Sequence, residues 1–138
     1  MMRRACLLTL LIAIAGCGTD GPQLAEVSGV VTVDGKPVPN AVVTFIPTGG
    51  STSYGKTDAQ GKYTLMFTDT KYGAMIGKHS VELEVRRYSP SELAEMKAAG
   101  ENVSTESVAI PRKYKAAGAL TAEVEEGSNT IDFKLTSN

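Results

Sequence analysis

The sequence predicts an all-β fold, an antiparallel β-sandwich of about seven strands with one short helix in a long crossover. Short segments in which apolar and polar residues alternate recur between positions 26 and 138, as expected of strands that bury one face. Glycine, proline and aspartate separate these segments at intervals of about ten residues. A helical signature occurs at one place, near positions 89–100. The 138 residues are enough for one domain of ordinary size.

The first half of this domain contains four predicted strands, each ended by turn residues. They are positions 27–33, 41–46, 54–57 and 62–67. The first strand ends at Asp34-Gly35, a pair that suits a two-residue hairpin turn. In the fourth strand, Tyr63, Leu65 and Phe67 occupy alternate positions and therefore share one face.

Three further strands are predicted in the second half. They are positions 79–86, 120–124 and 131–135. The first of them alternates most clearly, because His79 shares one face with the apolar Val81 and Leu83 while charged residues occupy the other face. The last two strands are joined by a turn predicted at 126–129.

The single helix is predicted to begin at Ser89-Pro90-Ser91-Glu92. This segment has the pattern of a capping box, with proline at the first helical position. Gly100 suits a left-handed cap at the end of the helix. Residues 101–118 show no period and are predicted to be an irregular part of the crossover.

Residues 1–16 are predicted to be a signal peptide. Arg3 and Arg4 give it a positively charged start, and an apolar run follows over positions 5–15. That run is much shorter than the ~20 apolar residues that a membrane-spanning helix needs. The mature chain is therefore expected to begin after position 16.

The segment Ile14-Ala15-Gly16-Cys17 resembles the lipobox of bacterial lipoproteins. The resemblance implies a thioether-linked lipid on Cys17, cleavage after Gly16, and acylation of the new amino terminus, for example with palmitate. Residues 17–25 are then the lipidated cysteine and a short tether to the domain at 26–138. Gly18 rather than aspartate follows the cysteine, which favours the periplasmic face of the outer membrane over the inner membrane. An ordinary secretory signal with an incidental cysteine, or a short buried helix, is the alternative.

Three segments of the domain resemble the carboxypeptidase regulatory-like family. They are positions 27–31 (VSGVV), 34–43 (DGKPVPNAVV) and 57–63 (TDAQGKY). The resemblance implies a transthyretin-like, or prealbumin-type, sandwich. Asn40 stands where this family usually has glycine, and asparagine also tolerates a left-handed backbone. Together with the lipobox, the segment at 110–114 (IPRKY) is similar to small lipoproteins of planctomycete-type bacteria. Neither resemblance implies an activity.

Residue types that carry catalysis or bind metals are scarce. The one histidine, His79, lies on an apolar face where packing is the expected role, and a zinc site needs three or four ligands. The hydroxyisourate hydrolases, an enzymatic branch of the transthyretin-like fold, use several histidines and a C-terminal Tyr-Arg-Gly-Ser that this sequence lacks. We therefore expect no enzymatic activity, cofactor or metal. Calcium at Asp34, Asp58 and Asp69, which lie in or near turns, is the one metal alternative.

Four tyrosines are candidates for roles at the surface. Tyr54, Tyr72 and Tyr88 are assigned to a possible interaction surface, because a tyrosine combines an apolar ring with a polar hydroxyl. Tyr114 is instead expected to hold the long crossover on the sandwich. The formal net charge of -1 gives no electrostatic reason to expect nucleic acid as a partner.

The sequence thus favours a non-enzymatic, lipid-anchored protein of the cell envelope that acts as a structural or interaction module. Its expected partners are a membrane, through the lipid on Cys17, and an unknown protein or glycan. One alternative is a carbohydrate- or peptide-binding module that uses the 48–54 loop and the 88–118 crossover. Another, implied by the family resemblance, is an accessory subunit of a partner hydrolase.

Overall fold

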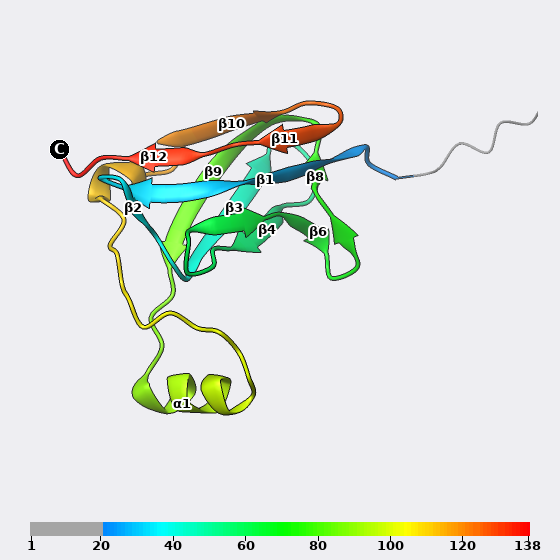
Figure 1. The fold of residues 1–138 in the computed structure, drawn as a ribbon. Helices are drawn as coiled ribbons and strands as arrows, with labels where there is room; N and C mark the ends of the chain where they lie inside the picture. Colours follow the sequence, from blue (N-terminus) through cyan, green and yellow to red (C-terminus); the bar gives the residue numbers. More distant parts are fainter. Residues whose placement is uncertain (1–20) are drawn as a thin grey trace, which may run out of the picture.

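A computed structural model describes residues 21–138 as two facing β-sheets from which one short helix projects (Figure 1). The signal peptide predicted over 1–16 and the predicted lipidation site at Cys17 lie outside the described residues. The elements are β1 (Leu24–Val33), β2 (Lys36–Pro37), β3 (Ala41–Pro47), β4 (Ser53–Lys56), β5 (Lys62–Thr64), β6 (Met66–Thr68), β7 (Lys71–Tyr72), β8 (Ala74–Met75), β9 (Gly77–Val85), α1 (Pro90–Ala98), the 3-10 helix η1 (Arg112–Tyr114), β10 (Leu120–Val124), β11 (Ser128–Thr130) and β12 (Phe133–Leu135).

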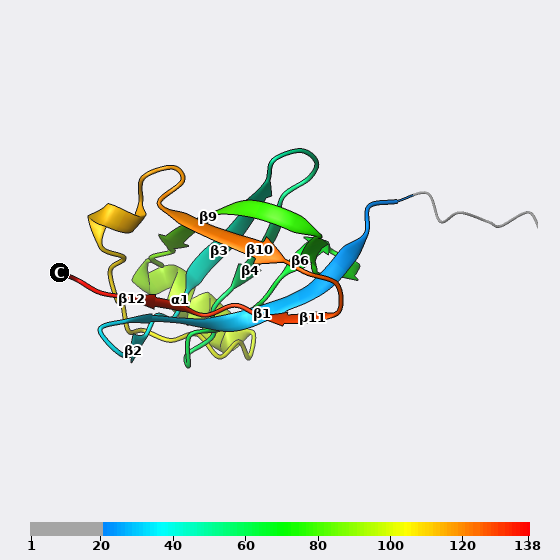
Figure 2. The ribbon, with the colours of Figure 1, turned by 90° about the horizontal axis from the view of Figure 1, so that it is seen from above.

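β1 is the central strand of the first sheet. It pairs with β2, β5 and β8 along one edge and with β11 and β12 along the other. The pairings with β11 and β12 are parallel, with Val27 opposite Asn129 and Val31 opposite Phe133, and Figure 2 shows these strands side by side. The antiparallel pairing predicted for the sandwich holds for the second sheet and for the pairs of β1 with β2, β5 and β8, whereas the pairs with β11 and β12 depart from it. Strand direction depends on where the chain returns to the sheet, and local alternation carries no information about that return.

The second sheet is antiparallel, in the order β10-β9-β3-β4-β6-β7. β9 and β3 form its centre, with Leu83 opposite Val43 and both side chains turned toward the first sheet. β10 pairs only with the first part of β9, between Gly77 and Val81. The rest of that edge of β9 extends beyond β10.

The strand predicted over 62–67 is two strands, because the chain changes sheets at Leu65. β5 pairs with β1 in the first sheet, and β6 pairs with β4 in the second. Leu65 is fully buried at the crossing point, where its N–H donates to the Val27 carbonyl and its own carbonyl accepts from Gly73 N–H. The alternation seen in the sequence persists across the crossing because Tyr63 and Leu65 both face the core.

The turn predicted at 126–129 is shorter in the structure, because β11 already begins at Ser128. The side chain of Asn129 closes the turn: its Oδ1 accepts from Glu125 N–H at 2.9 Å and its Nδ2 donates to the Glu125 carbonyl at 2.8 Å. The backbone of Asn129 therefore remains available to pair with β1.

The domain also begins earlier than predicted. Leu24 and Ala25, expected in the tether over 17–25, form the start of β1 and pair with Met75 and Ala74 of β8. β8 lies within a segment predicted to be a loop. A two-residue strand is too short to show the period on which the prediction relied.

The core lies between the sheets and consists of alternate residues from both. The rings of Phe45 and Phe133 meet edge to face with centroids 6.1 Å apart, so the aromatic side chains bridge the two layers. Gly29 permits the close packing of the first sheet, because a Cβ at this position would lie 1.8 Å from the Ile131 carbonyl oxygen. The buried apolar residues are Ala25, Val27, Val31, Val33, Val38, Ala41, Val43, Phe45, Tyr63, Leu65, Ala74, Val81, Leu83, Ile110, Val124, Phe133 and Leu135.

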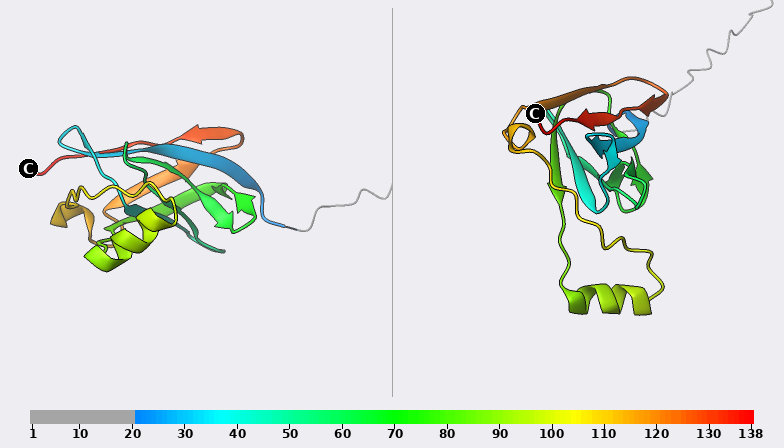
Figure 3. Two further views of the ribbon diagram at one scale, coloured as in Figure 1. Left: turned by 60° about the horizontal axis from the view of Figure 1, so that its bottom comes forward. Right: turned by 60° about the vertical axis from the view of Figure 1, so that its left-hand side comes forward.

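The helix predicted in the crossover is present as α1, but it does not pack on the sandwich. None of its residues is buried, and it stands away from the sheets at the end of two extended segments (Figure 3). We call residues 86–110, which comprise α1 and these two segments, the arm. The predicted capping box is confirmed: Ser89 Oγ accepts from Glu92 N–H, and the Glu92 carboxylate accepts from Ser89 N–H.

Candidate functional site

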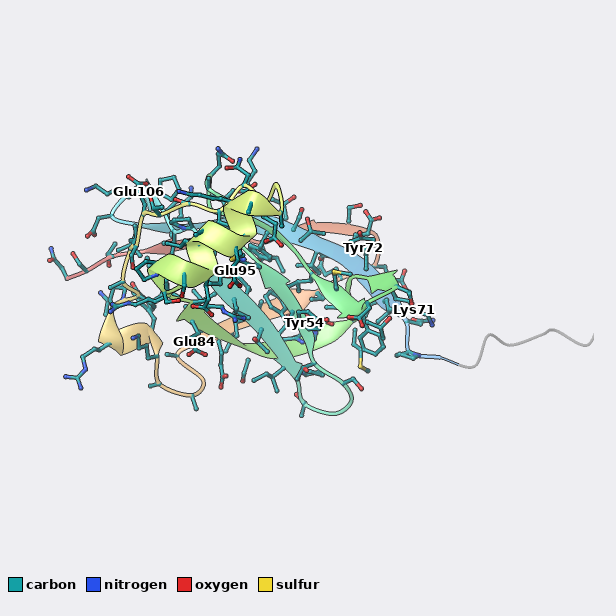
Figure 4. The ribbon with its side chains drawn as sticks, turned by 90° about the horizontal axis from the view of Figure 1, so that it is seen from below. Tyr54, Lys71, Tyr72, Glu84, Glu95 and Glu106 are labelled. Atoms are coloured by element: carbon teal, nitrogen blue, oxygen red, sulfur yellow. The ribbon has the colours of Figure 1, made fainter. Side chains whose placement is uncertain are left out.

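Two of the predicted surface tyrosines lie in one row across the second sheet. Tyr54 of β4 is opposite Met66 of β6, which is opposite Tyr72 of β7. Residues in such register share a face of the sheet, and here that face is exposed, with Tyr54 44% and Tyr72 64% accessible. Figure 4 shows both tyrosines and Lys71 on the same side of the molecule. The Tyr54 hydroxyl donates to Asp69 Oδ1 at 3.0 Å, and this hydrogen bond raises the pKa of Tyr54.

The third tyrosine of the predicted surface, Tyr88, lies at the base of the arm. Its hydroxyl accepts a hydrogen bond from Lys56 Nζ at 2.6 Å, and the Nζ atom lies 4.9 Å from the centre of the ring. The Arg86 guanidinium carbon lies 5.2 Å from the same centre. Two cations thus hold the ring in place. Tyr88 is linked to the row of Tyr54 only through Lys56, two residues along β4, so the structure divides the predicted surface into two parts.

A groove of ≈ 440 Å³ lies where the arm meets the sandwich. The Asn40 side chain spans its base by donating from Nδ2 to the Ser104 carbonyl at 2.8 Å, and the Asn40 carbonyl accepts from Arg86 N–H at 2.9 Å. The lining residues are Asn40, Arg86, Arg87, Tyr88, Leu93 and residues 104–107. Most of the lining comes from the predicted crossover over 88–118, but no pattern in the sequence indicated the groove itself.

The signal that could have revealed the groove is Asn40 itself. Its φ is 58°, a left-handed conformation that glycine adopts without strain. A glycine there would satisfy the turn but could not reach Ser104. The asparagine side chain thus combines a turn with a long-range contact, whereas the sequence analysis interpreted it only as a tolerated departure from glycine.

A second groove, of ≈ 430 Å³, follows the edge of β9 beyond β10. One wall includes Leu83 and Val85, and the other includes Ile110 and Tyr114. The Tyr114 hydroxyl accepts from Thr136 N–H at 3.1 Å, beyond the end of β12, and the bonds with Thr136 lower the pKa of Tyr114. This geometry fits the expected role of Tyr114 in holding the crossover on the sandwich.

His79 lies in the core, as expected for a packing residue. Its ring centre is 5.5 Å from that of Phe45, and Nε2 lies 2.7 Å from the Met75 carbonyl oxygen. Because that carbonyl can only accept, Nε2 carries the proton. Nδ1 is buried without a hydrogen-bond partner.

The three aspartates considered for calcium lie apart, and each accepts hydrogen bonds from different groups of the protein. Asp34 Oδ1 accepts from Ser137 N–H at 3.0 Å, Asp58 Oδ1 accepts from the N–H groups of residues 60 and 62, and Asp69 accepts from Tyr54. The hydrogen bond from Ser137 lowers the pKa of Asp34. Across residues 21–138, the structure brings together no group of three or more His, Cys, Asp or Glu side chains that could hold a metal ion. In that same part of the chain, no helix is long and apolar enough to cross a membrane.

No known protein family, curated protein or solved structure matches this chain. The two-sheet architecture with one short helix agrees with the predicted sandwich. The carboxypeptidase regulatory-like and transthyretin-like identifications stay predictions.

Proposed function

We propose that the protein is a non-enzymatic interaction module of the cell envelope, held at a membrane by a lipid on Cys17, and that the arm presents its binding surface to a protein partner. The observation that carries the proposal is α1, a capped helix without a single buried residue. A helix that contributes nothing to the core leaves most of its surface available for binding; only Leu93 and Met96 are half-buried.

Local interactions keep α1 helical without packing. An isolated helix of nine residues is marginal in water, so its end groups matter. The Ser89–Glu92 capping box provides acceptors for the backbone N–H groups of Ser89 and Glu92 at the start of the helix. At the other end, Gly100 has a φ of 80° and donates to the Lys97 carbonyl, which closes the last turn. The arm is thus built to hold its shape away from the sandwich.

One face of the arm is acidic, although residues 86–110 also include three basic side chains. Glu95 of α1 and Glu106 of the returning segment lie on the same side of the molecule as Glu84 of β9 (Figure 4). Both arm residues are exposed. A basic surface complements such a face and is steered toward it electrostatically. We therefore expect the partner to present lysine or arginine residues to the arm.

Charge reversal on the arm tests this proposal. The Glu95→Lys/Glu106→Lys variant is expected to lose a partner that crosslinks to the wild-type protein in intact cells. The matched control, Glu123→Lys/Glu125→Lys, changes the charge equally at β10 and the turn after it, and should retain the partner. All four sites are exposed, so each substitution should alter stability by less than ~0.5 kcal/mol. Equal recovery of the partner by both variants would contradict the assignment to the arm.

Membrane attachment is tested separately at Cys17. The Cys17→Ser variant should move from the detergent phase to the aqueous phase on phase separation, and mass spectrometry of the wild-type protein should show an acylated Cys17 at the amino terminus. A Cys17→Ser protein that still enters the detergent phase would place the anchor elsewhere.

The row of Tyr54, Met66 and Tyr72 favours one second candidate, a carbohydrate-binding module. Exposed aromatic rings can stack on the apolar faces of sugars, with Asp69 and Lys71 beside them as hydrogen-bonding groups. Binding on a glycan array that is lost in Tyr54→Ala and Tyr72→Ala, and kept in the arm variant, would favour this candidate over the first.

A further inference from the structure

Three large apolar side chains are exposed on the described part of the chain, residues 21–138. They are Tyr72, Ile76 and Tyr54, which are 64%, 37% and 44% accessible. The strand β8, which lies between Tyr72 and Ile76 in the sequence, is at the end of the sandwich where the chain leaves the domain toward its amino terminus (Figure 1). We call this region, residues 21–24 and 69–77, the proximal end. We propose that the proximal end lies against the lipid bilayer, with Tyr72 and Ile76 in its interfacial layer.

The proximal end is fixed directly to the start of the domain. Leu24 pairs with Met75, and Ile76 N–H donates to the Gln23 carbonyl at 3.2 Å. Just before this pairing, a Cβ on Gly73 would lie 2.4 Å from the Ala25 carbonyl oxygen, so the backbones are in contact. Tyr72 and Ile76 thus flank the short segment that is bonded to residues 23–25. Their position relative to the point where the chain leaves the sandwich is set by the backbone.

The chain between Cys17 and the proximal end is short in comparison with the length of the sandwich. This step rests on the lipid anchor proposed above. The seven peptide units from Cys17 to Leu24 span at most ~25 Å, and about 15 Å on average for a flexible chain. β9 begins beside the proximal end at Gly77 and runs nine residues to Val85 at the base of the arm. That length is ~27 Å of extended backbone. Tyr72 and Ile76 are therefore the part of the domain that the anchor brings to the bilayer first.

The exposed side chains suit the lipid interface. A tyrosine places its ring among the upper acyl chains and its hydroxyl among the headgroups, and an isoleucine adds apolar area. The exposed Lys71 beside Tyr72 can reach lipid phosphates, while Asp69 is already bonded to the Tyr54 hydroxyl. Contacts of this kind are weak singly. The covalent anchor raises their effective concentration at the surface, so a small patch is enough to orient the domain.

The sequence contains no tryptophan, which allows a direct test. A tryptophan introduced at one position is then the only one in the protein, and its fluorescence reports on that position alone. Two proximal variants, Tyr72→Trp and Ile76→Trp, are compared with two arm variants, Tyr88→Trp and Leu93→Trp. Each full-length, lipidated protein is reconstituted into vesicles of phosphatidylethanolamine and phosphatidylglycerol, with or without brominated phosphatidylcholine as quencher. We expect the fluorescence of the proximal pair to be roughly halved by the brominated lipid and shifted to the blue. The arm pair should be unchanged.

The outcomes separate this inference from the proposed anchor. If Cys17→Ser abolishes vesicle binding and the proximal tryptophans of the lipidated protein are not quenched, the anchor stands and the orientation is wrong. Quenching of the tryptophans in all four variants means that the domain lies flat on the bilayer, which also contradicts the proposed orientation. If the wild-type protein carries no lipid and does not bind vesicles, both proposals fall. A soluble glycan that shifts the emission of the Tyr72→Trp variant, while brominated lipid does not, would assign Tyr72 to sugar binding instead.

Discussion

The proximal end and the arm lie at opposite ends of β9 and are held in different ways. At the proximal end, β8 pairs with β1, and Gly73 packs directly on the backbone of Ala25. The arm has no strand pairing and no buried residue in α1; it is fastened by side chains such as Asn40 and Tyr88. Backbone pairing makes the proximal end part of the cooperative sandwich. Most of the arm depends instead on a few polar contacts that solvent can replace, because Ile110 at its end is the one buried residue between positions 86 and 110. The difference teaches that one domain can contain a rigid surface and a surface that adjusts to a partner.

The largest expected difference between the sandwich and the arm concerns stability. Phe45→Ala removes a fully buried ring that contacts Phe133 and His79, and should lower the free energy of unfolding by about 3–5 kcal/mol. Leu93→Ala in α1, where nothing is buried, should lower it by less than ~1 kcal/mol. Urea denaturation of both variants checks this. Similar losses would mean that the arm unfolds together with the sandwich.

A smaller effect is expected at the junction of the two regions. Asn40→Asp keeps a residue that tolerates the left-handed backbone but replaces the amide that donates to the Ser104 carbonyl by a carboxylate that cannot donate. Because this position is buried, the loss should be about 1–3 kcal/mol. Hydrogen exchange should become faster in the arm and stay slow in β3 and β9. Thr105→Ala is the control, because it shortens the exposed neighbouring side chain and leaves the Ser104 carbonyl in place. An arm with unchanged protection in Asn40→Asp would show that other contacts fasten it.

The arm should also respond to acid before the sandwich does. The hydrogen bond from Ser89 N–H lowers the pKa of Glu92, so the folded helix favours the charged carboxylate. Its contribution is present above the pKa of the unfolded chain and is lost as pH falls through the lowered pKa of the folded state. The protection of the α1 amides, measured relative to their intrinsic exchange rate at each pH, should therefore fall in mild acid while that of β9 does not. Glu92→Gln, which can still accept the bond but does not titrate, should abolish the pH dependence.

The smallest effect is expected at Ser53, one of two buried hydroxyls at the two ends of β4. Ser53 Oγ has no hydrogen-bond partner, so Ser53→Ala should be neutral or stabilise the protein by up to ~1 kcal/mol. Thr57 Oγ1 instead donates to the Val38 carbonyl at 2.6 Å and accepts from Ala41 N–H at 2.8 Å. Thr57→Val, with the same shape, should cost ~1–3 kcal/mol, because it leaves backbone groups unpaired. Thermal denaturation distinguishes the two variants. An equal loss of stability in Ser53→Ala and Thr57→Val would imply that Ser53 Oγ has a hydrogen-bond partner.

The turns and the local caps were predictable from the sequence. The Asp58 turn and the Ser89 capping box depend on residues within four positions of each other, and both form as predicted. The alternation at 79–86 likewise predicted the inner face of β9, including the buried His79. Interactions of this kind are short in sequence, so the residue types specify them directly.

The candidate sites were less predictable because they join distant residues. The sequence marked Tyr54, Tyr72 and Tyr88 as one surface, but the register of β4, β6 and β7 aligns only the first two. The third is held by Lys56, thirty-two positions away. Similarly, the groove at the base of the arm depends on the contact between Asn40 and Ser104, which are sixty-four positions apart. No local pattern indicates such a pair.

By itself, the sequence determined where strands, turns and the helix form, because periodicity, glycine and capping residues act within a few positions of one another. Only the tertiary structure decided that β1 pairs in parallel with the last strands, that the chain changes sheets at Leu65, and that Tyr72 and Ile76 lie beside the start of the domain. These features follow from which strands meet across the sandwich. That choice reflects the burial of the whole core, a property that no short segment carries.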